Sequence, residues 1–448
     1  MSSNNSEDIL RQSPVPAKPD PYLALRFVDF RLFLIGIFIA SMGEQMINVA
    51  LGWELYERTG SALVLGLVGL VQVTPILLLS LPAGHIADRY NRKRIMLIAV
   101  AIIALSALGL TLLSLLHGPL ALFYVCIFCI GTATAFYAPA SSAFVPHTIP
   151  DSAYTNAATW DSSSWQLAAV VGPALSGLLI ALMHSAFLVY ALNIGTHLIF
   201  LLLLLRTRMR YASEKQERKR EEQEQRPLRA LGEGLNFLWR TQIILAAITL
   251  DLFAVLLGGA TTLLPIFAKS ILHVGPVGLG WLRTAPSIGA ICVAFGLAHA
   301  PAMKRAGPLL LLTVACFGVA TVVFGLSRMF WLSLLMLFLL GGFDNISVVI
   351  RGTLLMTRTP DEMRGRVGSV NSLFIGASNE LGGFESGLVA QLFGPVISVV
   401  AGGIGTILVV LAVTFLWPEM RRLRHLHVDE VKQVEQGDNT ETVSSPRK

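Results

Sequence analysis

The sequence predicts an all-α polytopic membrane protein with twelve transmembrane helices arranged as two six-helix bundles. Of its 448 residues, 54% are hydrophobic and 14% are charged, and the mean hydropathy is +0.65. Soluble globular proteins carry about 25% charged residues, so most of this surface is expected to contact lipid. Twelve helices of about 20 residues need roughly 240 residues, which the chain supplies. The composition therefore excludes a soluble enzyme, a nucleic-acid-binding domain and a disulfide-rich secreted domain.

Twelve apolar runs, each bounded by charged residues, glycine or proline, mark the predicted helices. The first set covers residues 31–55, 62–85, 95–116, 120–146, 155–183 and 185–205, and the second covers residues 241–269, 276–300, 308–327, 331–357, 367–392 and 395–417. Each run approaches or exceeds the length that crosses a hydrocarbon core of about 30 Å. We therefore expect an N-terminal bundle over residues 31–205 and a C-terminal bundle over residues 241–417.

Polar segments join and flank the two predicted bundles. The linker 206–240 contains the run from Glu214 to Glu222, in which opposite charges three and four residues apart favour a solvated surface helix. The tails 1–30 and 418–448 are polar, and we expect disorder in the C-terminal one. The polar N-terminal stretch is unlike a cleavable signal peptide.

The distribution of lysine and arginine predicts the orientation in the membrane. If the N-terminus is cytoplasmic, 29 of the 34 Lys and Arg residues fall on the cytoplasmic side. Arg58, Lys269 and Arg328 fall on the opposite side, and Arg283 and Arg351 lie within helices. By the positive-inside rule, both termini are expected in the cytoplasm of a multi-pass protein of the plasma or inner membrane.

The two sets of helices share a weak internal repeat. Residues 131–181 align without a gap with residues 341–391 at a constant offset of 210, and eight positions are identical. The identical pairs include Gly172 with Gly382 and Gly177 with Gly387. Because parallel six-helix repeats are a transporter architecture, the repeat favours two pseudo-symmetric halves.

The loop after the second predicted helix carries a motif. Residues 84–94 read GHIADRYNRKR, which resembles the G-x-x-x-D-R-x-G-R-K signature of the major facilitator superfamily, with Asn91 in place of the usual glycine. The resemblance implies a gating loop formed by Gly84, Asp88, Arg89, Asn91, Arg92, Lys93 and Arg94. In it, Gly84 would let a neighbouring helix approach, and Asp88 would accept hydrogen bonds from a facing helix N-terminus. We expect Asn91 in the left-handed conformation. The alternative is an ordinary basic loop.

Further segments narrow the resemblance. Residues 52–63, 359–367 and 371–376 look like the enterobactin-exporter-like branch of that superfamily, and the resemblance extends over essentially the whole chain. It implies the major facilitator fold, with two pseudo-symmetric bundles, a central cavity and alternating access. Members of this branch export siderophores, and relatives export macrolides and other drugs.

The fifth predicted helix contains AAVVGPALSG over residues 168–177. This is similar to the G-x-x-x-G-P-x-x-G-G pattern of antiporter-type facilitators, with alanine and serine in place of two glycines. Pro173 cannot donate a backbone hydrogen bond, so we expect a bend there, and Gly172 and Gly177 permit close helix contact. A plain structural kink is the alternative. The fourth predicted helix lacks the arginine of many proton-coupled facilitators, which argues against transferring that coupling mechanism.

Polar side chains inside the predicted helices are candidates for substrate binding or proton coupling, because they are costly to place in a bilayer. They are Glu44, Gln45, Asn48, Asp251, Arg283, Asp344, Arg351, Glu380 and Glu385. Glu44 lies near the membrane midplane and is the first candidate for the proton carrier, with Asp344 second. The alternative for each is a buried ion pair or hydrogen bond that holds helices in register. We expect structural roles for Asp161 and for His197, which has no plausible ligand near it in sequence.

These observations predict a secondary active transporter that exports a small amphipathic molecule, siderophore-like or drug-like, in exchange for protons. No G-x-x-x-x-G-K-S motif for ATP binding occurs, and we expect no cofactor, no metal, no nucleic-acid partner and a monomer in the lipid bilayer. Alternatives are a proton symporter that imports a nutrient and a transport-dead sensor or scaffold. A membrane enzyme would need catalytic groups that converge at one depth, and the histidines are too scattered to suggest them.

Overall fold

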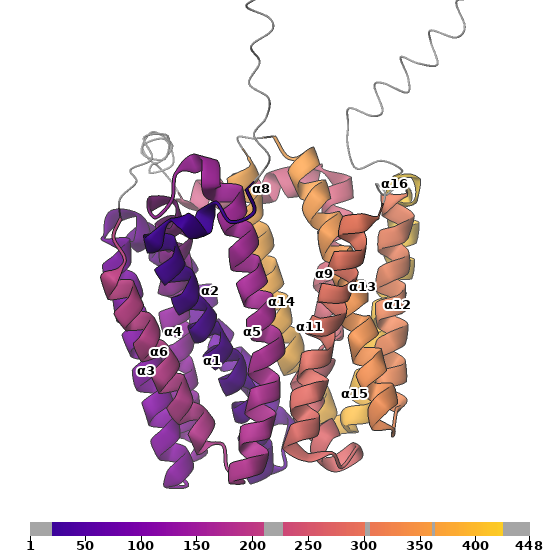
Figure 1. Cartoon of the computed structure of the whole chain (residues 1–448). Coiled ribbons are helices and arrows are strands. Elements are labelled where there is room, and N and C mark those ends of the chain that lie inside the picture. The colour runs from indigo at the N-terminus through magenta and orange to yellow at the C-terminus, as the bar shows by residue number, and fades with distance from the viewer. Residues whose placement is uncertain (1–19, 210–226, 301–304, 361–362, 424–448) are drawn as a thin grey trace, which may run out of the picture.

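The computed structural model describes residues 20–209, 227–300, 305–360 and 363–423. Long helices run side by side along one common direction (Figure 1), and no strand occurs within these ranges. The first and last described residues and α8 lie at the same end of the molecule (Figure 1), which we call the terminal end. We call the other end the opposite end.

The N-terminal half consists of six long helices and three short 3₁₀ turns. The long helices are α1 (Val28–Thr59), α2 (Ala62–Arg89), α3 (Arg92–Leu115), α4 (Leu120–Phe144), α5 (Tyr154–Met183) and α6 (Phe187–Arg206), and the turns are η1 (Ala24–Arg26), η2 (Val145–His147) and η3 (Asp151–Ala153). Gly60 ends α1 with a φ of 62°, a left-handed conformation that glycine adopts without strain. This turn allows α2 to begin two residues later.

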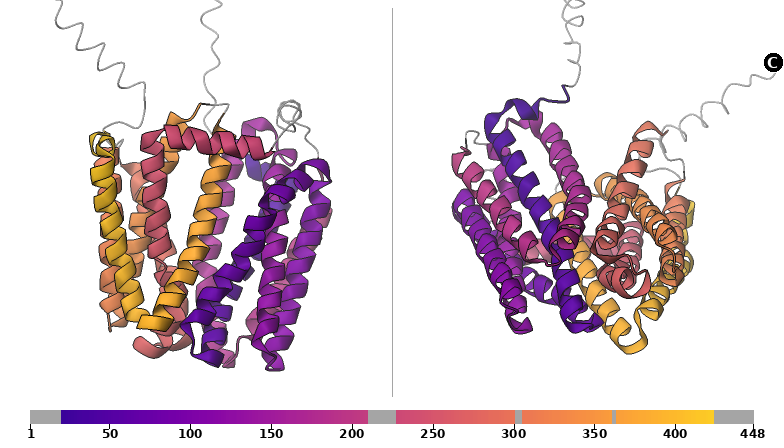
Figure 2. Two further views of the ribbon diagram at one scale, coloured as in Figure 1. Left: turned by 180° about the vertical axis from the view of Figure 1, so that it is seen from behind. Right: turned by 60° about the horizontal axis from the view of Figure 1, so that its bottom comes forward.

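The C-terminal half repeats this arrangement with a helix that crosses the surface before it. That surface helix is α8 (Pro227–Arg240), and the half itself contains α9 (Gln242–Leu257), η4 (Ala260–Leu263), α10 (Leu264–Ile266), η5 (Phe267–Ile271), α11 (Gly275–His299), α12 (Ala306–Leu326), α13 (Phe330–Arg358), α14 (Arg364–Phe393), α15 (Pro395–Leu416) and α16 (Pro418–Arg422). Figure 2 shows the indigo-to-magenta half beside the pink-to-yellow half.

The predicted fold class is confirmed. In the part of the chain that is described, 11 helical segments are long and apolar enough to cross a membrane. The twelfth, α14, has 30 residues and is therefore long enough, but its serine, asparagine and glutamate residues make it more polar. A polar helix is acceptable there because α14 packs between α2, α9 and α15 rather than facing lipid alone.

One predicted helix is broken. The sequence predicts a continuous helix over residues 241–269, whereas α9 ends at Leu257 and the chain continues through η4, α10 and the π-helical turn η5. Two consecutive glycines follow Leu257, and a Cβ on Gly259 would come within 2.6 Å of the carbonyl oxygen of Gly382. Close backbone packing against α14 therefore accompanies the break, and local hydropathy does not report such packing.

The linker helix α8 lies across the terminal end (Figure 2, left) and contacts α14, α9 and α2. Nη1 of Arg366 donates to Oε2 of Glu233 at 2.5 Å. A Cβ on Gly234 would lie 3.1 Å from the carbonyl oxygen of Arg366, so α8 sits tightly on α14. The surface helix expected over Glu214–Glu222 and the tail beyond Leu423 lie outside the described residues.

The two halves contact each other toward the opposite end. There α2 packs on α14 and α5 packs on α11. Oγ of Ser61 donates to Oε1 of Gln391 at 2.9 Å, and Nζ of Lys269 lies 3.3 Å from Oε1 of Glu57. Trp53 and Phe267 belong to one hydrophobic cluster that contains residues of both halves. The interface is therefore closed at this end.

Candidate functional site

The predicted membrane-embedded candidates do not form one site. They occupy a chamber inside the N-terminal half, a small pocket inside the C-terminal half and the interface between the halves. Gln45 lies outside these places, packed against α5, where a Cβ on Gly172 would come within 2.7 Å of its Cβ. Asn48 is half-buried on α1.

The chamber in the N-terminal half has a volume of about 230 Å³. Its walls come from α1, α3, α4, α5 and α6, and they are mainly aliphatic and aromatic. Glu44 is exposed to this space from α1. It forms no salt bridge and no hydrogen bond with any other described residue. Apart from Glu44, the lining contains no charged aspartate, glutamate, lysine or arginine side chain.

Five further polar side chains line the chamber, namely Ser41, Thr134, Tyr137, Asn193 and His197. Sequence reasoning proposed none of them as a binding residue and expected a structural role for His197. Asn193 is 1% exposed, and both polar atoms of its amide lack a hydrogen-bond partner in the described structure. The hydroxyl of Tyr137 is also buried and lies beside Ser141. His197 holds its Nδ1 3.0 Å from the carbonyl oxygen of Asn193. The sequence signal was the pair Asn193 and His197, four residues apart on an otherwise apolar helix, which places them on one face.

A second cavity of about 320 Å³ adjoins the chamber. The two cavities share Ile37, Ser41 and Trp165. Asp161 lines the second cavity from the part of α5 nearer the terminal end. The shared residues place this cavity beside the chamber on its terminal-end side, between α1 and α5.

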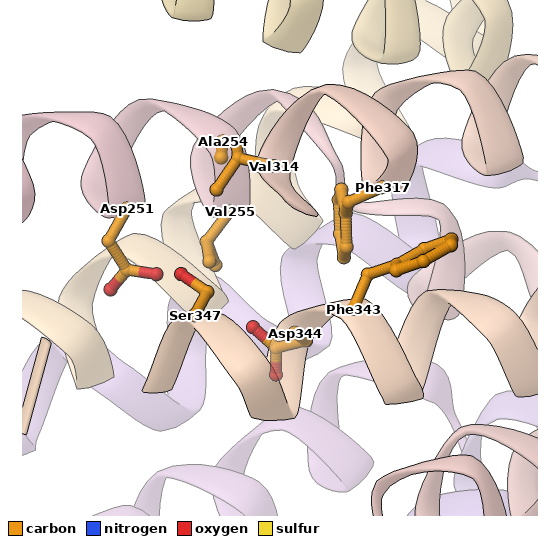
Figure 3. A pocket seen from close by; sticks show the side chains of 8 residues that line it. All are labelled: Asp251, Ala254, Val255, Val314, Phe317, Phe343, Asp344 and Ser347. Atoms are coloured by element: carbon orange, nitrogen blue, oxygen red, sulfur yellow. The ribbon is translucent and has the colours of Figure 1, made fainter. Parts of the chain in front are cut away.

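The pocket in the C-terminal half holds two carboxylates and lies beside one arginine. Asp251 on α9 forms a buried salt bridge with Arg351 on α13. Asp344 and Ser347 of α13 line the same pocket as Asp251 (Figure 3). The pocket has a volume of about 10 Å³. This space is close to that of one water molecule. The expected alternative of a buried ion pair therefore applies to Asp251 and Arg351, while Asp344 forms no salt bridge among the described residues.

The third group lies where α14 meets α2. A Cβ on Gly69 would come within 2.6 Å of Oε2 of Glu380. Glu380 forms no salt bridge among the described residues but lies within electrostatic range of Arg283 and of Glu44. Nη1 of Arg283 donates to the carbonyl oxygen of Thr261 at 3.1 Å. Because Thr261 belongs to the broken segment after α9, Arg283 binds a carbonyl of irregular backbone. Glu385 accepts a hydrogen bond from Oγ of Ser386 at 3.4 Å.

Two expectations for the gating loop were wrong in this conformation. Asn91 has a φ of −64°, and its side chain accepts a hydrogen bond from the backbone N–H of Arg94. Asn91 therefore caps the N-terminus of α3 and is not in the left-handed region. Gly84 does not admit a neighbouring helix, since a Cβ there would meet nothing within 4 Å.

The basic residues of this loop bind the ends of other helices. Nζ of Lys93 donates to the carbonyl oxygens of Leu205 and Thr207, both at 2.8 Å, and these carbonyls lie at the C-terminus of α6. Nη1 of Arg92 donates to the carbonyl oxygen of Ala143 at 3.1 Å near the end of α4. Cations are favourable at helix C-termini. Asp88, Arg89 and Arg94 lie at the same turn and are exposed.

Small residues of α5 provide close contacts with both halves. A Cβ on Gly172 would come within 2.8 Å of the carbonyl oxygen of Met42 on α1, and one on Gly177 within 2.5 Å of that of Pro276 on α11. A Cβ on Gly280 would likewise come within 2.7 Å of the carbonyl oxygen of Pro173. The Gly172–Gly177 segment of α5 is therefore packed between α1 and the C-terminal half.

Comparison with known proteins gives one family and several efflux proteins. Residues 33–383 match the family model described as Major Facilitator Superfamily. The chain is 26% identical over 399 residues to the enterobactin exporter EntS of Citrobacter koseri, covering 88% of this chain and 93% of that protein. It is also 26% identical over 400 residues to the multidrug efflux pump Tap of Mycolicibacterium fortuitum, covering 88% of this chain and 96% of that protein.

Solved structures share the fold at low sequence identity. A bacterial homologue of the human lysosomal transporter Spinster, in an inward-facing and occupied conformation, superposes with a TM-score of 0.68 and 14% identity, covering 90% of this chain and 99% of that chain. The nucleoside transporter NupG superposes with a TM-score of 0.66 and 13% identity, covering 87% of this chain and 99% of that chain. At these identities, the likeness concerns the fold.

Proposed function

The chain belongs to the Major Facilitator Superfamily, and from that premise we propose that this membrane transporter exports a small amphipathic molecule in exchange for protons. Transport itself follows from the family and from the curated relatives. The direction and the coupling ion are the proposal. Its setting is a monomer in the plasma or inner membrane with both termini in the cytoplasm, as the distribution of lysine and arginine favours.

The imbalance of charge among the candidate residues carries the proposal of proton coupling. Five of the candidates are carboxylates and two are arginines. Arg351 pairs with Asp251, whereas Arg283 forms no salt bridge among the described residues and is only within electrostatic range of Glu380, as Arg351 is of Asp344. Glu44, Asp344 and Glu385 form no salt bridge within the described ranges. Because an unpaired charge is costlier than its protonated form in apolar surroundings, these three carboxylates are suited to take up and release a proton.

The contacts between the halves support alternating access. The halves pack against each other toward the opposite end, through glycines such as Gly177 and Gly280 that bring backbones together. The cavity that adjoins the chamber lies nearer the terminal end. With the terminal end in the cytoplasm, this conformation would accept its cargo from the cytoplasm, and a second conformation would release it outside.

Two relatives support export over import. One is named an enterobactin exporter and the other a multidrug efflux pump, and each match spans 88% of this chain. The partial antiporter-type pattern in α5 favours the same direction. A siderophore or a drug-like compound is therefore the first class of cargo to test.

The test is transport by purified protein in liposomes under an imposed pH gradient, with a panel of siderophores and drugs. Wild-type protein should accumulate a cargo against its gradient only while protons flow the other way. Asp344→Asn and Glu44→Gln should each reduce this accumulation at least tenfold, and Asp344→Asn should keep counterflow without a gradient. Glu419→Gln is the matched control, because Glu419 is exposed on α16 at the terminal end, away from the closed contact between the halves.

Three outcomes decide between the candidate functions. Cargo that moves in the same direction as protons would replace export with symport. Accumulation that is equal in wild type, Glu44→Gln and Asp344→Asn would place the coupling site elsewhere, with Glu380, Glu385 and Asp251 next. Accumulation without any dependence on the pH gradient would remove proton coupling.

A further inference from the structure

We propose that the chamber inside the N-terminal half binds the cationic head of an organic monocation, with Glu44 as its counter-charge. The inference rests on the proposed transport function and adds the chemical class of the cargo. It also places the site among α1, α3, α4, α5 and α6 of the N-terminal half, within electrostatic range of Glu380 of the C-terminal half.

The charge of the residues that line the chamber favours a cationic ligand. Glu44 is exposed to the chamber, and no lysine or arginine lines either this space or the adjoining cavity. The other titratable groups that line these spaces are Tyr137, His197 and Asp161. The only charge that Asp161 can add is negative. An anionic cargo would therefore meet repulsion, whereas a cation would gain the partner that the described chain does not supply.

The walls of the chamber contain buried polar atoms that form no hydrogen bond with other described residues. Asn193 is 1% exposed, and its amide oxygen and nitrogen both lack partners among the described residues. The amide nitrogen faces α1, where a Cβ on Gly43 would lie 2.8 Å from it. The Tyr137 hydroxyl is likewise buried, with Ser141 as its neighbouring polar group. Buried polar groups without partners are rare, so their presence around one cavity points to a ligand or to bound water.

The histidine adds an acceptor. The carbonyl oxygen of Asn193 can only accept, so the nearby Nδ1 of His197 must carry the proton of that hydrogen bond. In a neutral ring, Nε2 is then left as an acceptor. Glu44, Nε2 of His197 and the amide oxygen of Asn193 are therefore acceptors for a protonated amine.

The volume of the chamber and its apolar walls fit a small aromatic cation. A cavity of about 150 Å³ accommodates benzene, so a chamber of about 230 Å³ has room for one aromatic ring with a small cationic head. Trp165, Tyr137 and Phe200 contribute aromatic rings to the lining, and cations bind favourably to aromatic faces. The adjoining cavity of about 320 Å³ can take a larger apolar body.

The test is equilibrium binding of radiolabelled N,N-dimethylbenzylamine, which is protonated at neutral pH, to the full chain in detergent, without a pH gradient. The neutral N,N-dimethyl-2-phenylacetamide and the anionic phenylacetate serve as matched competitors. We expect saturable binding of the cation and at least tenfold weaker competition by the neutral and anionic compounds. Glu44→Gln should weaken binding of the cation at least tenfold, and Asn193→Leu should weaken it while keeping the carboxylate.

Glu419→Gln, at an exposed position of α16, is the control and should bind the cation as wild type does. Absence of saturable binding, or equal binding by wild type and Glu44→Gln, would overturn the proposal and leave water as the occupant. Binding that depends on Glu44 in a protein without pH-driven transport would retain this site and reject the coupling mechanism, so the two failures are distinguishable. If Glu44→Gln does not give monodisperse protein, Asn193→Leu and the competitor series decide alone.

Discussion

Replacing Gly177 with alanine should open the contact between the halves toward the opposite end. A Cβ at this position would lie 2.5 Å from the carbonyl oxygen of Pro276 and 3.0 Å from Cα of Gly280. Both contacted atoms belong to the backbone of α11, so a side-chain rotation cannot relieve the overlap. Either α5 and α11 must separate or one of them must shift.

The magnitude follows from the cost of overpacking a close contact. An added methyl group in a well-packed region costs about 1–3 kcal/mol. This cost applies only while α5 and α11 touch, so it should change the ratio between this conformation and one that is open at the opposite end by about 5–150-fold. Gly195→Ala is the matched control within a helix, because a Cβ there would meet nothing within 4 Å and helix propensity changes equally.

The assay measures the reactivity of a cysteine introduced at the contact. Ser61→Cys places the thiol where the serine hydroxyl now donates to Gln391, in a background in which the four native cysteines are replaced by serine. Modification by a maleimide should be faster in the Gly177→Ala variant than in the Gly195→Ala variant. Gly280→Ala should act in the same direction, because its Cβ would lie 2.7 Å from the carbonyl oxygen of Pro173. Equal rates in all the variants would refute the reasoning.

Three further predictions concern stability, measured by denaturation in detergent. Arg351→Met leaves Asp251 buried without its cation and should lower the free energy of unfolding by about 3–5 kcal/mol. The double variant with Asp251→Asn should regain most of this stability. Equal destabilisation in the single and double variants would contradict the pairing. Asn91→Ala should cost about 0.5–2 kcal/mol through loss of the helix cap, while Asn91→Asp keeps it; a variant Asn91→Gly more stable than wild type would argue against the cap. Lys93→Met should cost about 0.3–1 kcal/mol and increase hydrogen exchange at the end of α6, whereas Lys93→Arg should not.

The long helices were predictable because membrane insertion depends on the hydropathy of consecutive residues. Hydropathy is a local property of the sequence, so it predicts a helix without information on which helices pack against it. It also located α14, because an apolar background remains around its serines and glutamates. The break after Leu257 was not predictable in this way. Two glycines permit either a helix or a break, and the backbone of α14 that packs against Gly259 comes more than 120 residues later in the sequence.

The loop after α2 shows the limit of a motif. The spacing of acidic and basic residues marks the turn between α2 and α3, and the turn is present. The position of Asn91 in the motif suggested the conformation of a glycine, whereas an asparagine directly before a helix more often acts as its N-cap. The structure follows the local capping rule, since the N–H of Arg94 needs an acceptor.

The candidate site depends on contacts between side chains that lie far apart in the sequence. The position within an apolar helix marks Glu44, Asp251 and Asp344 equally well as candidates for binding or proton coupling, since each is an acidic residue in an apolar run. Their surroundings differ because Arg351 bonds to a residue 100 positions away, while the groups that line the chamber of Glu44 supply no cation. A count of charges in the sequence cannot show this division. Asp251 is therefore neutralised within the protein, whereas Glu44 is left available to a proton or a cationic cargo, which is the arrangement that the proposed exchange of protons for cations requires.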